Sequence, residues 1–452
     1  MEVTKQLAQF VVNHSYSNIS ADIRELAKLT IIDSLGCCIA GYIEAREECE
    51  WIVELVKELG GKPESSVFMN GFMTSAPFAA LVNGTMIHSI DFDDTHMGSI
   101  SHFSASLVPT VFCMAEKLQT DGPALLEAFV VGFEVGARVG RRMMPSHYRF
   151  WHPTSTFGSL ASAAAASKLL GLDALQTEYA LGLTADQAGG LRYGIDKGDY
   201  SKSLHPGFAA MHGVMLALLV LKGANGPKGI LEYPTGFCHA LSEEPQIEKI
   251  VDGLGKPYEI TANSLKAYPT ILISHSSIQA ILAMVEEHDL ESSQIEKVRL
   301  TVSSTAKGQG QNYNPETPLA ARLSIPFSVA LALVDKEVSL KQFTRKRLHD
   351  PLIKDMMARI EIEADPSLNA EYPETLASIA VLETKTKGTL KNQVIYPKGN
   401  MKNPMTKDDV LAKYRALCSG AMDRNKSEQI LQRLLDLDQT DALQELFDLL
   451  RG

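Results

Sequence analysis

The 452-residue sequence contains no uninterrupted run of about 18 apolar residues, the length that a membrane-spanning helix needs. It contains no extended block of basic residues either, and its formal net charge is −11. We therefore expect neither a membrane nor a nucleic acid among its partners. The first residues lack the basic-then-apolar pattern of a secretory signal, which favours a cytoplasmic protein.

Cysteine is scarce as well. The six cysteines form no C-x-x-C pair, and most of them lie inside apolar helical patterns. This is typical of free, buried thiols in a reducing compartment. The glycines of residues 189–198 lack the strand–turn–helix context of a dinucleotide-binding loop, and no G-x-S-x-G nucleophile motif is present. The sequence therefore lacks the signatures of nucleotide-dependent enzymes and of serine hydrolases.

At this length the chain should hold more than one hydrophobic core. Helical periodicity dominates up to about residue 265 and returns from residue 406. Between them, four segments show strand patterns, namely residues 295–303, 359–363, 377–384 and 389–396. We predict a mainly α protein with an α+β second domain. The large all-helical domain is discontinuous, with residues 1–266 and 401–452, and residues 267–400 form a smaller α+β lid domain.

Two of the predicted helices, residues 155–170 and 207–223, are rich in small side chains, which allow helices to approach closely. They present more apolar surface than one helical domain can readily bury, so we expect a homodimer through this domain. In the smaller domain the periodicity predicts helices over residues 319–334 and 340–358.

The stretch from His88 to His102 concentrates polar side chains between two apolar helical patterns. It contains three carboxylates, three imidazoles and a threonine, namely Asp91, Asp93, Asp94, His88, His96, His102 and Thr95. Such groups are costly to bury unless they are paired, so we interpret the stretch as an active-site candidate. One alternative is a turn that caps the next helix. Another is a metal site, because imidazole and carboxylate are common ligands.

Three further segments place basic or imidazole groups beside proline and small residues. His152 precedes Pro153 at the start of a predicted helix, where an anion is favoured. Lys202 and His205 precede another predicted helix. Lys266 and Tyr268 lie at the predicted domain junction, where small-molecule sites are common. Together they predict a pocket for a di- or tricarboxylate, whose lysines would repel a metal cation. The alternatives are a loop-capping histidine at residue 152 and a surface lysine at residue 202.

With these motifs the sequence resembles the MmgE/PrpD family, which includes 2-methylcitrate dehydratase, cis-aconitate decarboxylase and iminodisuccinate epimerase. The resemblance rests on Ile32–Gly36, His88–Thr95, Trp151–Thr154, Lys202–His205, Lys266–Pro269 and Ala321–Phe327. It implies a large helical domain with an α+β lid, a homodimer, and catalysis without a cofactor or required metal. Carried over by position, the implied pocket residues are Asp91, Thr95, His102, His152, Lys202 and Lys266.

The resemblance implies proton transfer at the carbon α to a substrate carboxylate, in a dehydration, decarboxylation or epimerisation. We expect Lys202, Lys266 and His152 to bind carboxylates, and His102 to act as acid or base. Asp91 and Thr95 would orient His102 or share the proton transfer, while His205, Tyr268 and His96 would complete the substrate-binding set. Neither lysine is expected to contribute to core packing.

The motifs lie closest to the decarboxylase and epimerase branch, with 2-methylcitrate dehydratase as an alternative. Three positions depart from the family pattern. Phe103 follows His102 where proline is usual. Phe327 stands where many relatives have a tyrosine, and Ile271 lies where the decarboxylases tend to have a histidine. The change at residue 327 leaves a second hypothesis open, a non-catalytic protein that binds polycarboxylates.

Overall fold

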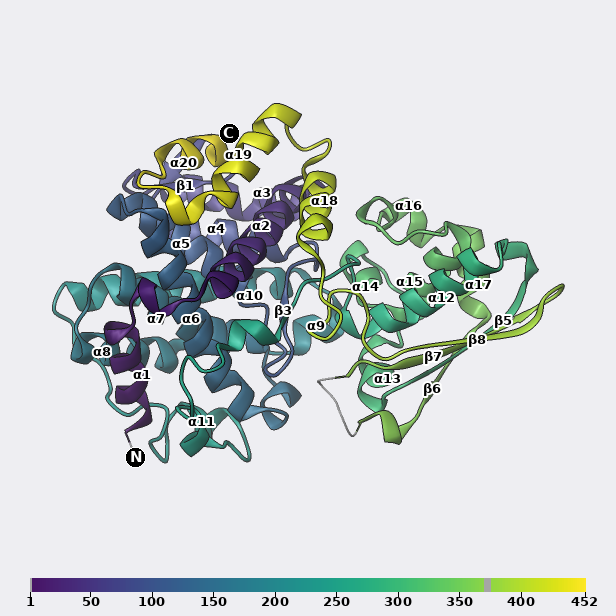
Figure 1. The fold of residues 1–452 in the computed structure, drawn as a ribbon, viewed down its shortest axis with the longest axis horizontal. Helices are drawn as coiled ribbons and strands as arrows, with labels where there is room; N and C mark the ends of the chain where they lie inside the picture. The colour runs from purple at the N-terminus through teal and green to yellow at the C-terminus, as the bar shows by residue number, and fades with distance from the viewer. Residues whose placement is uncertain (1, 370–374) are drawn as a thin grey trace.

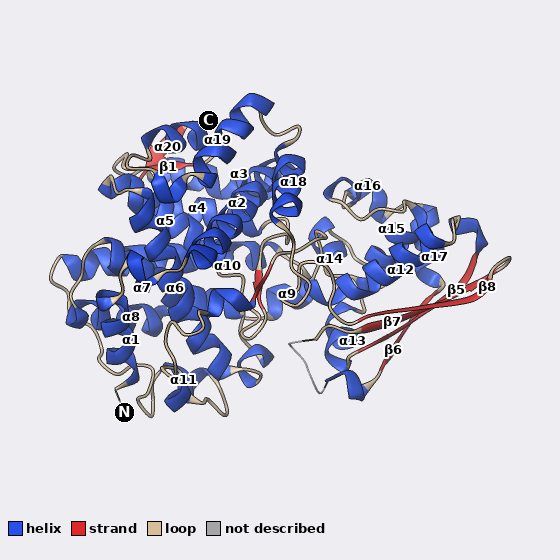
Figure 2. Ribbon diagram, in the orientation of Figure 1, coloured by secondary structure: helices blue, strands red, loops and turns tan. Residues whose placement is uncertain are grey.

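A computed structural model describes residues 2–369 and 375–452. The chain forms two bodies, each with its own hydrophobic core. In Figure 1 the larger body contains the purple and blue N-terminal part together with the yellow C-terminal helices, whereas the smaller body is green. Figure 2 shows that the larger body is almost entirely helical and that the long strands lie in the smaller one. The predicted fold class is confirmed.

The larger body is built almost entirely from packed helices. Its helices are α1 (Val3–Asn13), α2 (Ala21–Glu44), α3 (Arg46–Leu59), α4 (Ala76–His88), α5 (Ser104–Leu118), α6 (Gly122–Met143), α7 (Pro153–Leu169), α8 (Ala174–Gln187), α9 (Tyr193–Lys197), α10 (Tyr200–Leu221), α11 (Phe237–Leu241), α18 (Lys407–Cys418), α19 (Arg424–Leu435) and α20 (Gln444–Arg451). Two short strand pairs accompany them, β1 (Ser65–Val67) with β2 (Phe72–Thr74), and β3 (Thr95–His96) with β4 (Asn263–Ser264). As predicted, α18–α20 return to this body, where their apolar side chains join its core. The predicted domain limits stay a prediction.

Glycines bring the helices that carry the later site residues into direct contact. Gly84 on α4 faces Gly207 on α10, and a Cβ added at Gly207 would lie 2.3 Å from the carbonyl oxygen of Leu81. On the other side of α10, a Cβ at Gly213 would lie 2.5 Å from the Cβ of Ser162 on α7. The close contact predicted for the alanine-rich helix is therefore present. It fixes the end of α4 and the start of α10 relative to each other.

The same packing removes one argument for a dimer. Residues 153–167 of α7 are buried within the protomer, so this helix leaves no surface for a second chain. Helix α10 differs, because Phe208, Met215 and Leu219 are 38%, 43% and 47% exposed.

The smaller body is a four-stranded sheet covered by helices. The strands β5 (Ile295–Val302), β6 (Ile360–Ala364), β7 (Ser378–Thr384) and β8 (Gly388–Val394) lie in the order β6-β5-β7-β8. Only β5 and β6 are parallel to each other. The helices are α12 (His275–Glu287), α13 (Ser304–Gly310), α14 (Pro318–Arg322), α15 (Ile325–Val334), α16 (Arg345–Leu348) and α17 (Pro351–Ala358).

Two helices predicted in this body are each broken. Residues 319–334 form α14 and α15, because Ser324 caps a new helix by accepting a hydrogen bond from the amide of Phe327. Residues 340–358 form α16 and α17 after a short 3₁₀ turn, because Asp350 caps a helix whose first residue is Pro351. Because the apolar periodicity continues across both breaks, the sequence predicts one unbroken helix in each case and does not reveal the capping residues.

Helices α2 and α10 are long and apolar enough to cross a membrane by length and composition. However, 78% of the apolar 18-residue stretch of α2 and 50% of that of α10 are buried within the protein. Core helices meet the same criterion of length and composition. All six cysteines are buried free thiols, as predicted.

Candidate active site

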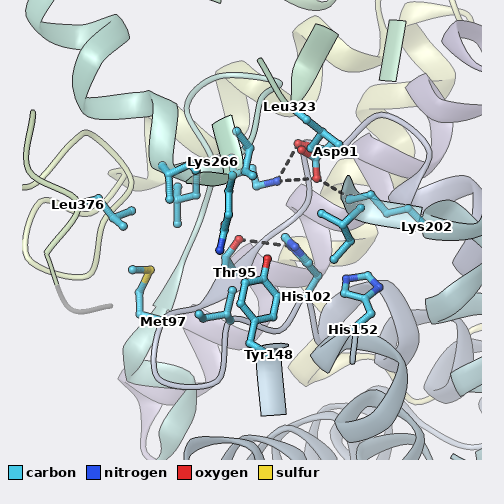
Figure 3. Close-up of a pocket in the computed structure, with 16 residues that line it drawn as sticks. Asp91, Thr95, Met97, His102, Tyr148, His152, Lys202, Lys266, Leu323 and Leu376 are labelled. Carbon is cyan, nitrogen blue, oxygen red and sulfur yellow. Dashed lines mark hydrogen bonds and ion pairs between the residues drawn. The ribbon is translucent and has the colours of Figure 1, made fainter. Parts of the chain in front are cut away.

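One pocket lies between the two bodies and contains all six residues to which the sequence assigned catalysis. Asp91, Thr95, His102, His152, Lys202 and Lys266 line it together with apolar side chains from both bodies. They come from the loop after α4, from β3, from the residues before α5 and α7, from the first turn of α10 and from the segment after β4. Figure 3 shows them converging on one space. Their chemical roles stay predictions.

The most strongly charged part of the pocket is a carboxylate shared by two ammonium groups. Lys202 Nζ lies 2.8 Å and Lys266 Nζ 3.0 Å from Asp91 Oδ1, and Lys266 also donates to the Asp91 carbonyl oxygen at 2.8 Å. Burial acts to raise the pKa of the Asp91 carboxyl, but the two lysines outweigh it and hold that pKa well below its usual value. Asp91 is therefore a fixed anion, and the three side chains carry a net charge of +1.

Both lysines are buried, with 2% and 1% of their surface exposed for Lys202 and Lys266. The expectation that neither lysine contributes to packing is wrong, because each neutralises a carboxylate that has no access to water. The backbone of Asp91 is also unusual, with φ 52° in the left-handed region. This conformation is tolerated by aspartate better than by most residues, and it directs the side chain to both lysines.

His88 extends this network and has a defined tautomer. Lys202 Nζ lies 2.9 Å from His88 Nε2, and because an ammonium group can only donate, Nε2 is the acceptor. The proton of the neutral ring is therefore on Nδ1, which lies 2.8 Å from Asp93 Oδ2. His88 is completely buried and, like Asp93, does not line the pocket. The sequence singled out both residues but gave neither a role.

The geometry of His102 suits a base. Its Nδ1 lies 2.5 Å from the carbonyl oxygen of Asp94 and 3.3 Å from Thr95 Oγ1, so Nδ1 carries the proton. Nε2 makes no hydrogen bond within the described residues. Burial, reinforced by the charge of Lys266, lowers the pKa of His102 to about 3, although Asp93 opposes the shift. The imidazole is therefore neutral at neutral pH. Asp91, which was expected to orient this ring, binds the two lysines instead.

His152 lies at the N-cap of α7 and faces His205 on α10. Their Nδ1 atoms are 2.8 Å apart, so one ring donates and the other accepts. Burial, together with the neighbouring imidazoles and Lys202, lowers the pKa of His152 well below its usual value. His152 lines the pocket, whereas His205 supports it from behind. Helix α10 begins at Tyr200, capped by Asp199, so Lys202 and His205 lie within the helix rather than before it.

Three residues predicted to bind substrate do not line the pocket, namely His205, His96 and Tyr268. His96 points away from it, with Nε2 3.2 Å from Glu259 Oε2 and Nδ1 2.8 Å from Ser99 Oγ. Tyr268 packs its ring 5.2 Å from that of His275. Residue 96 follows Thr95 on a strand, where neighbouring side chains point to opposite faces, so only Thr95 can face the pocket.

Phe327 also lies away from the pocket. Its side chain is 1% exposed in the core of the smaller body, where its ring lies 5.8 Å from Phe343. A tyrosine at this position would add no hydroxyl to the pocket, so the observation that supported a non-catalytic protein loses its force. Ile271, by contrast, does line the pocket.

Two groups of side chains have the spacing of metal ligands, His88 with His102 and His152, and His88 with Asp91 and Asp93. Both contain His88, whose Nε2 already accepts a hydrogen bond from Lys202. In the second group, Asp91 Oδ1 also contacts both ammonium groups. A cation would have to displace fixed positive charges, so the donor atoms fit a metal poorly.

Lys413 is a functional candidate that the sequence analysis missed. It lies on α18 and is 8% exposed, and its Nζ donates to the carbonyl oxygens of Phe92 and Lys266 at 2.8 and 3.0 Å. The same atom lies 2.8 Å from Asp33 Oδ1 on α2. Lys413 thus fixes the backbone of the residue after Asp91 and of Lys266 itself. The sequence could have identified Lys413 by its position on the same helix face as the apolar Val410 and Leu417, because a charged residue on a buried face needs a partner.

Comparison with known families agrees with these motifs. The MmgE/PrpD N-terminal domain model matches residues 5–250, and the MmgE/PrpD C-terminal domain model matches residues 268–437. The chain belongs to the MmgE/PrpD family. This MmgE/PrpD protein is 28% identical over 478 residues to cis-aconitate decarboxylase-like protein oryM of Aspergillus oryzae, which covers 100% of the chain and 97% of that protein.

Other relatives carry related names. Cis-aconitate decarboxylase of Mus musculus is 26% identical over 469 residues, covering 100% of this MmgE/PrpD chain and 93% of the mouse protein. Mitochondrial 2-methylcitrate dehydratase of Yarrowia lipolytica is 24% identical over 399 residues, covering 82% of this chain and 74% of the Yarrowia protein. The named relatives are lyases, which supports an enzyme with a small carboxylate substrate.

The buried histidines predict how the stability of the protein depends on pH. Eight of the twelve histidines have lowered pKa values, and in each of the eight burial is the largest cause. The value is about 4 for His147 and His205 and about 3 for His102 and His275. In the unfolded chain these rings take up protons near pH 6.5, whereas in the folded protein they stay neutral to a much lower pH. The stability that the neutral rings contribute above pH 6.5 is therefore lost as the pH falls towards about 4.

Three buried carboxyls with raised pKa values, Asp33, Asp94 and Glu134, act in the opposite sense but are outnumbered. Urea unfolding at roughly pH 7.5 and pH 5 should show a falling midpoint and an uptake of more than about one proton on unfolding. An unchanged midpoint would contradict the neutral, buried state of the rings.

The Lys413–Asp33 pair can be tested with single and double substitutions. Lys413→Met leaves the carboxylate of Asp33 buried without its partner and should cost about 3–5 kcal/mol of stability, with loss of activity. Asp33→Asn/Lys413→Met removes both charges and should recover most of the stability. If Lys413 positions Lys266, the double variant should stay low in kcat. Full recovery of kcat would show that the pair serves stability alone.

Proposed function

We propose that this protein is a lyase or isomerase of the MmgE/PrpD type that transfers a proton at the carbon α to a carboxylate of a small di- or tricarboxylate. Dehydration, decarboxylation and epimerisation all share this step. The observation that carries the proposal is the combination of a neutral His102, protonated on Nδ1, with two ammonium groups in the same pocket. A base and a cationic site for the developing negative charge are the two groups that this chemistry requires.

The residues have distinct parts in this mechanism. Lys202 and Lys266 bind the carboxylate next to the reacting carbon and stabilise the charge that forms when the proton leaves. His102 takes the proton on Nε2. The resulting imidazolium is stabilised by the Asp94 carbonyl oxygen, 2.5 Å from Nδ1, and by Asp93, whose Oδ2 lies 3.8 Å away. His152 supplies a second imidazole on the same side of the pocket.

The way in which the carbanion forms and reacts distinguishes the candidate reactions. In a dehydration, the carbanion left by proton removal expels a β-hydroxyl group. In a decarboxylation, the carbanion forms when carbon dioxide leaves, and it then takes up a proton. In an epimerisation, the removed proton returns to the other face. The cis-aconitate decarboxylase relatives, which match the whole chain at 26–28% identity, favour decarboxylation. The dehydratase of Yarrowia lipolytica keeps 2-methylcitrate dehydration as the second candidate.

The proposal is tested by solvent deuterium incorporation. The wild-type protein, incubated in deuterium oxide with a panel of di- and tricarboxylates, should place deuterium at the α-carbon of at least one acid, as followed by NMR. His102→Gln should slow this exchange by about two to four orders of magnitude, because it removes the base. The exposed His349 provides the control, and His349→Gln should leave the exchange unchanged. Absence of exchange with every acid would refute the proposal and favour a binding protein.

We also propose a homodimer through the larger body. Its support is the exposed apolar stripe of Phe208, Met215 and Leu219 on α10, which are spaced along one helix face. The double variant Met215→Lys/Leu219→Lys should halve the mass measured by light scattering. Leu175→Lys, at an equally exposed leucine on α8, should not. A monomeric wild-type protein at micromolar concentration would contradict the proposal.

A further inference from the structure

The pocket has two chemically different ends. In Figure 3, Asp91, Lys202 and His152 lie on one side, while Met97 and Leu376 lie on the opposite side. The proposed function uses the first end only. The second end has no role in binding or activating a carboxylate, and its composition carries information about the rest of the substrate.

The second end is mainly apolar and is contributed by both bodies, although the pocket lining also includes the polar side chains of Tyr148 and Gln309. Met97 comes from the larger body, whereas Ile271, Leu272 and Ile273 come from the segment that leads into α12. Met97 packs into the core of the smaller body together with Leu272 and Ile273, and Ile271 packs against that core. The apolar wall of the pocket is therefore continuous with a packed core.

Backbone strain supports this interpretation independently. Ile100 also lines the pocket and has φ 53°, in the left-handed region. A β-branched residue is a genuine outlier there. Asp91, at the charged end, is the other residue of this loop held with a positive φ. Strained residues cluster at ligand sites, and here one strained residue presents a charge while the other presents an apolar side chain.

The charges of the lining also limit what can bind. Within the described residues, Lys202 and Lys266 are the only cationic side chains that line the pocket, and Asp91 already neutralises one of them. The remaining excess of one positive charge matches one ionised carboxylate. A further carboxylate placed at the apolar end would face Met97 and Leu272 without a cation, which is costly in a buried pocket.

We infer that the substrate presents one carboxylate to the lysine pair and an apolar, alkyl-sized substituent to the opposite end of the pocket. The inference rests on the proposed function and narrows its substrate class: an alkyl-substituted carboxylic acid is preferred over a compact tricarboxylate. Met97, Ile271 and Ile273 select for that substituent, while His102 and the lysines act on the other end.

Two acids of nearly the same shape test this directly. Tricarballylate and 2-isobutylsuccinate differ in that an isopropyl group replaces one carboxylate. The wild-type protein should bind 2-isobutylsuccinate at least about tenfold more tightly by calorimetry, and should exchange its α-proton with deuterium more efficiently. Along the series methyl-, ethyl- and propylsuccinate, affinity should rise about fourfold for each added methylene group until the apolar end is filled.

A charge introduced at the apolar end should reverse the preference. Ile271 lines the apolar end and is only partly buried, so Ile271→Lys has room to fold. It should bind tricarballylate more tightly than 2-isobutylsuccinate, because the third carboxylate gains a cation. Ile395→Lys, at a 44% exposed isoleucine outside the pocket, is the matched control and should keep the preference of the wild-type protein.

The possible outcomes separate this inference from the proposed function. Tighter binding of tricarballylate by the wild-type protein would overturn the inference, and so would an unchanged preference in a folded Ile271→Lys variant. If the alkyl acids bind more tightly but no acid exchanges deuterium, the inference on the ligand holds and the proposed proton transfer fails. If exchange occurs with tricarballylate alone, the proposed function holds and the apolar substituent is wrong.

Discussion

The arrangement of the site depends on one buried interaction, the contact of Asp91 with two lysines. A carboxylate between two ammonium groups is not a neutral pair, because the three groups carry one positive charge in excess, and the next anion, Asp93, reaches them only through His88. Burying that charge is costly, and a bound anion reduces the cost. Under the proposed function, a substrate carboxylate would supply this anion. Two almost fully buried lysines can therefore bind an anion in addition to holding Asp91 in place.

Much of the surrounding fold keeps this interaction in place. Asp91 follows α4, Lys202 lies in the first turn of α10, and the glycine contact between these helices fixes their separation. Lys266 follows β4, which pairs with β3 through Thr95 and Ser264. Lys413 then binds the carbonyl oxygens of Phe92 and Lys266 from the opposite side. Segments from all parts of the larger body meet here, and the return of α18 to this body is what brings Lys413 to the site.

The sequence predicted these elements where the signal was local. Helical and strand periodicity located α5 and β5 closely, and polar groups between apolar helices pointed to the loop from His88 to His102. What it could not predict depended on contacts far apart in the chain. Nothing local distinguished His102, which faces the pocket, from His96, whose partner Glu259 is 163 residues away. Pro206 suggested a later start for α10, but the Asp199 cap and packing against α4 place the proline inside the helix.

The low pKa of His102 links substrate binding to the strength of the base. Burial and the charges of Lys266 and Lys202 lower the pKa of this imidazole, so the ring is neutral. Under the proposed function, a carboxylate bound to the lysines offsets their charge, which raises the proton affinity of His102. The base would then become effective when the acid to be deprotonated is bound. Asp93 contributes in the same direction, because its carboxylate lies 3.8 Å from His102 Nδ1 and becomes a better partner once the ring is charged. The shared carboxylate of Asp91 thus sets both where the substrate binds and when the histidine can act.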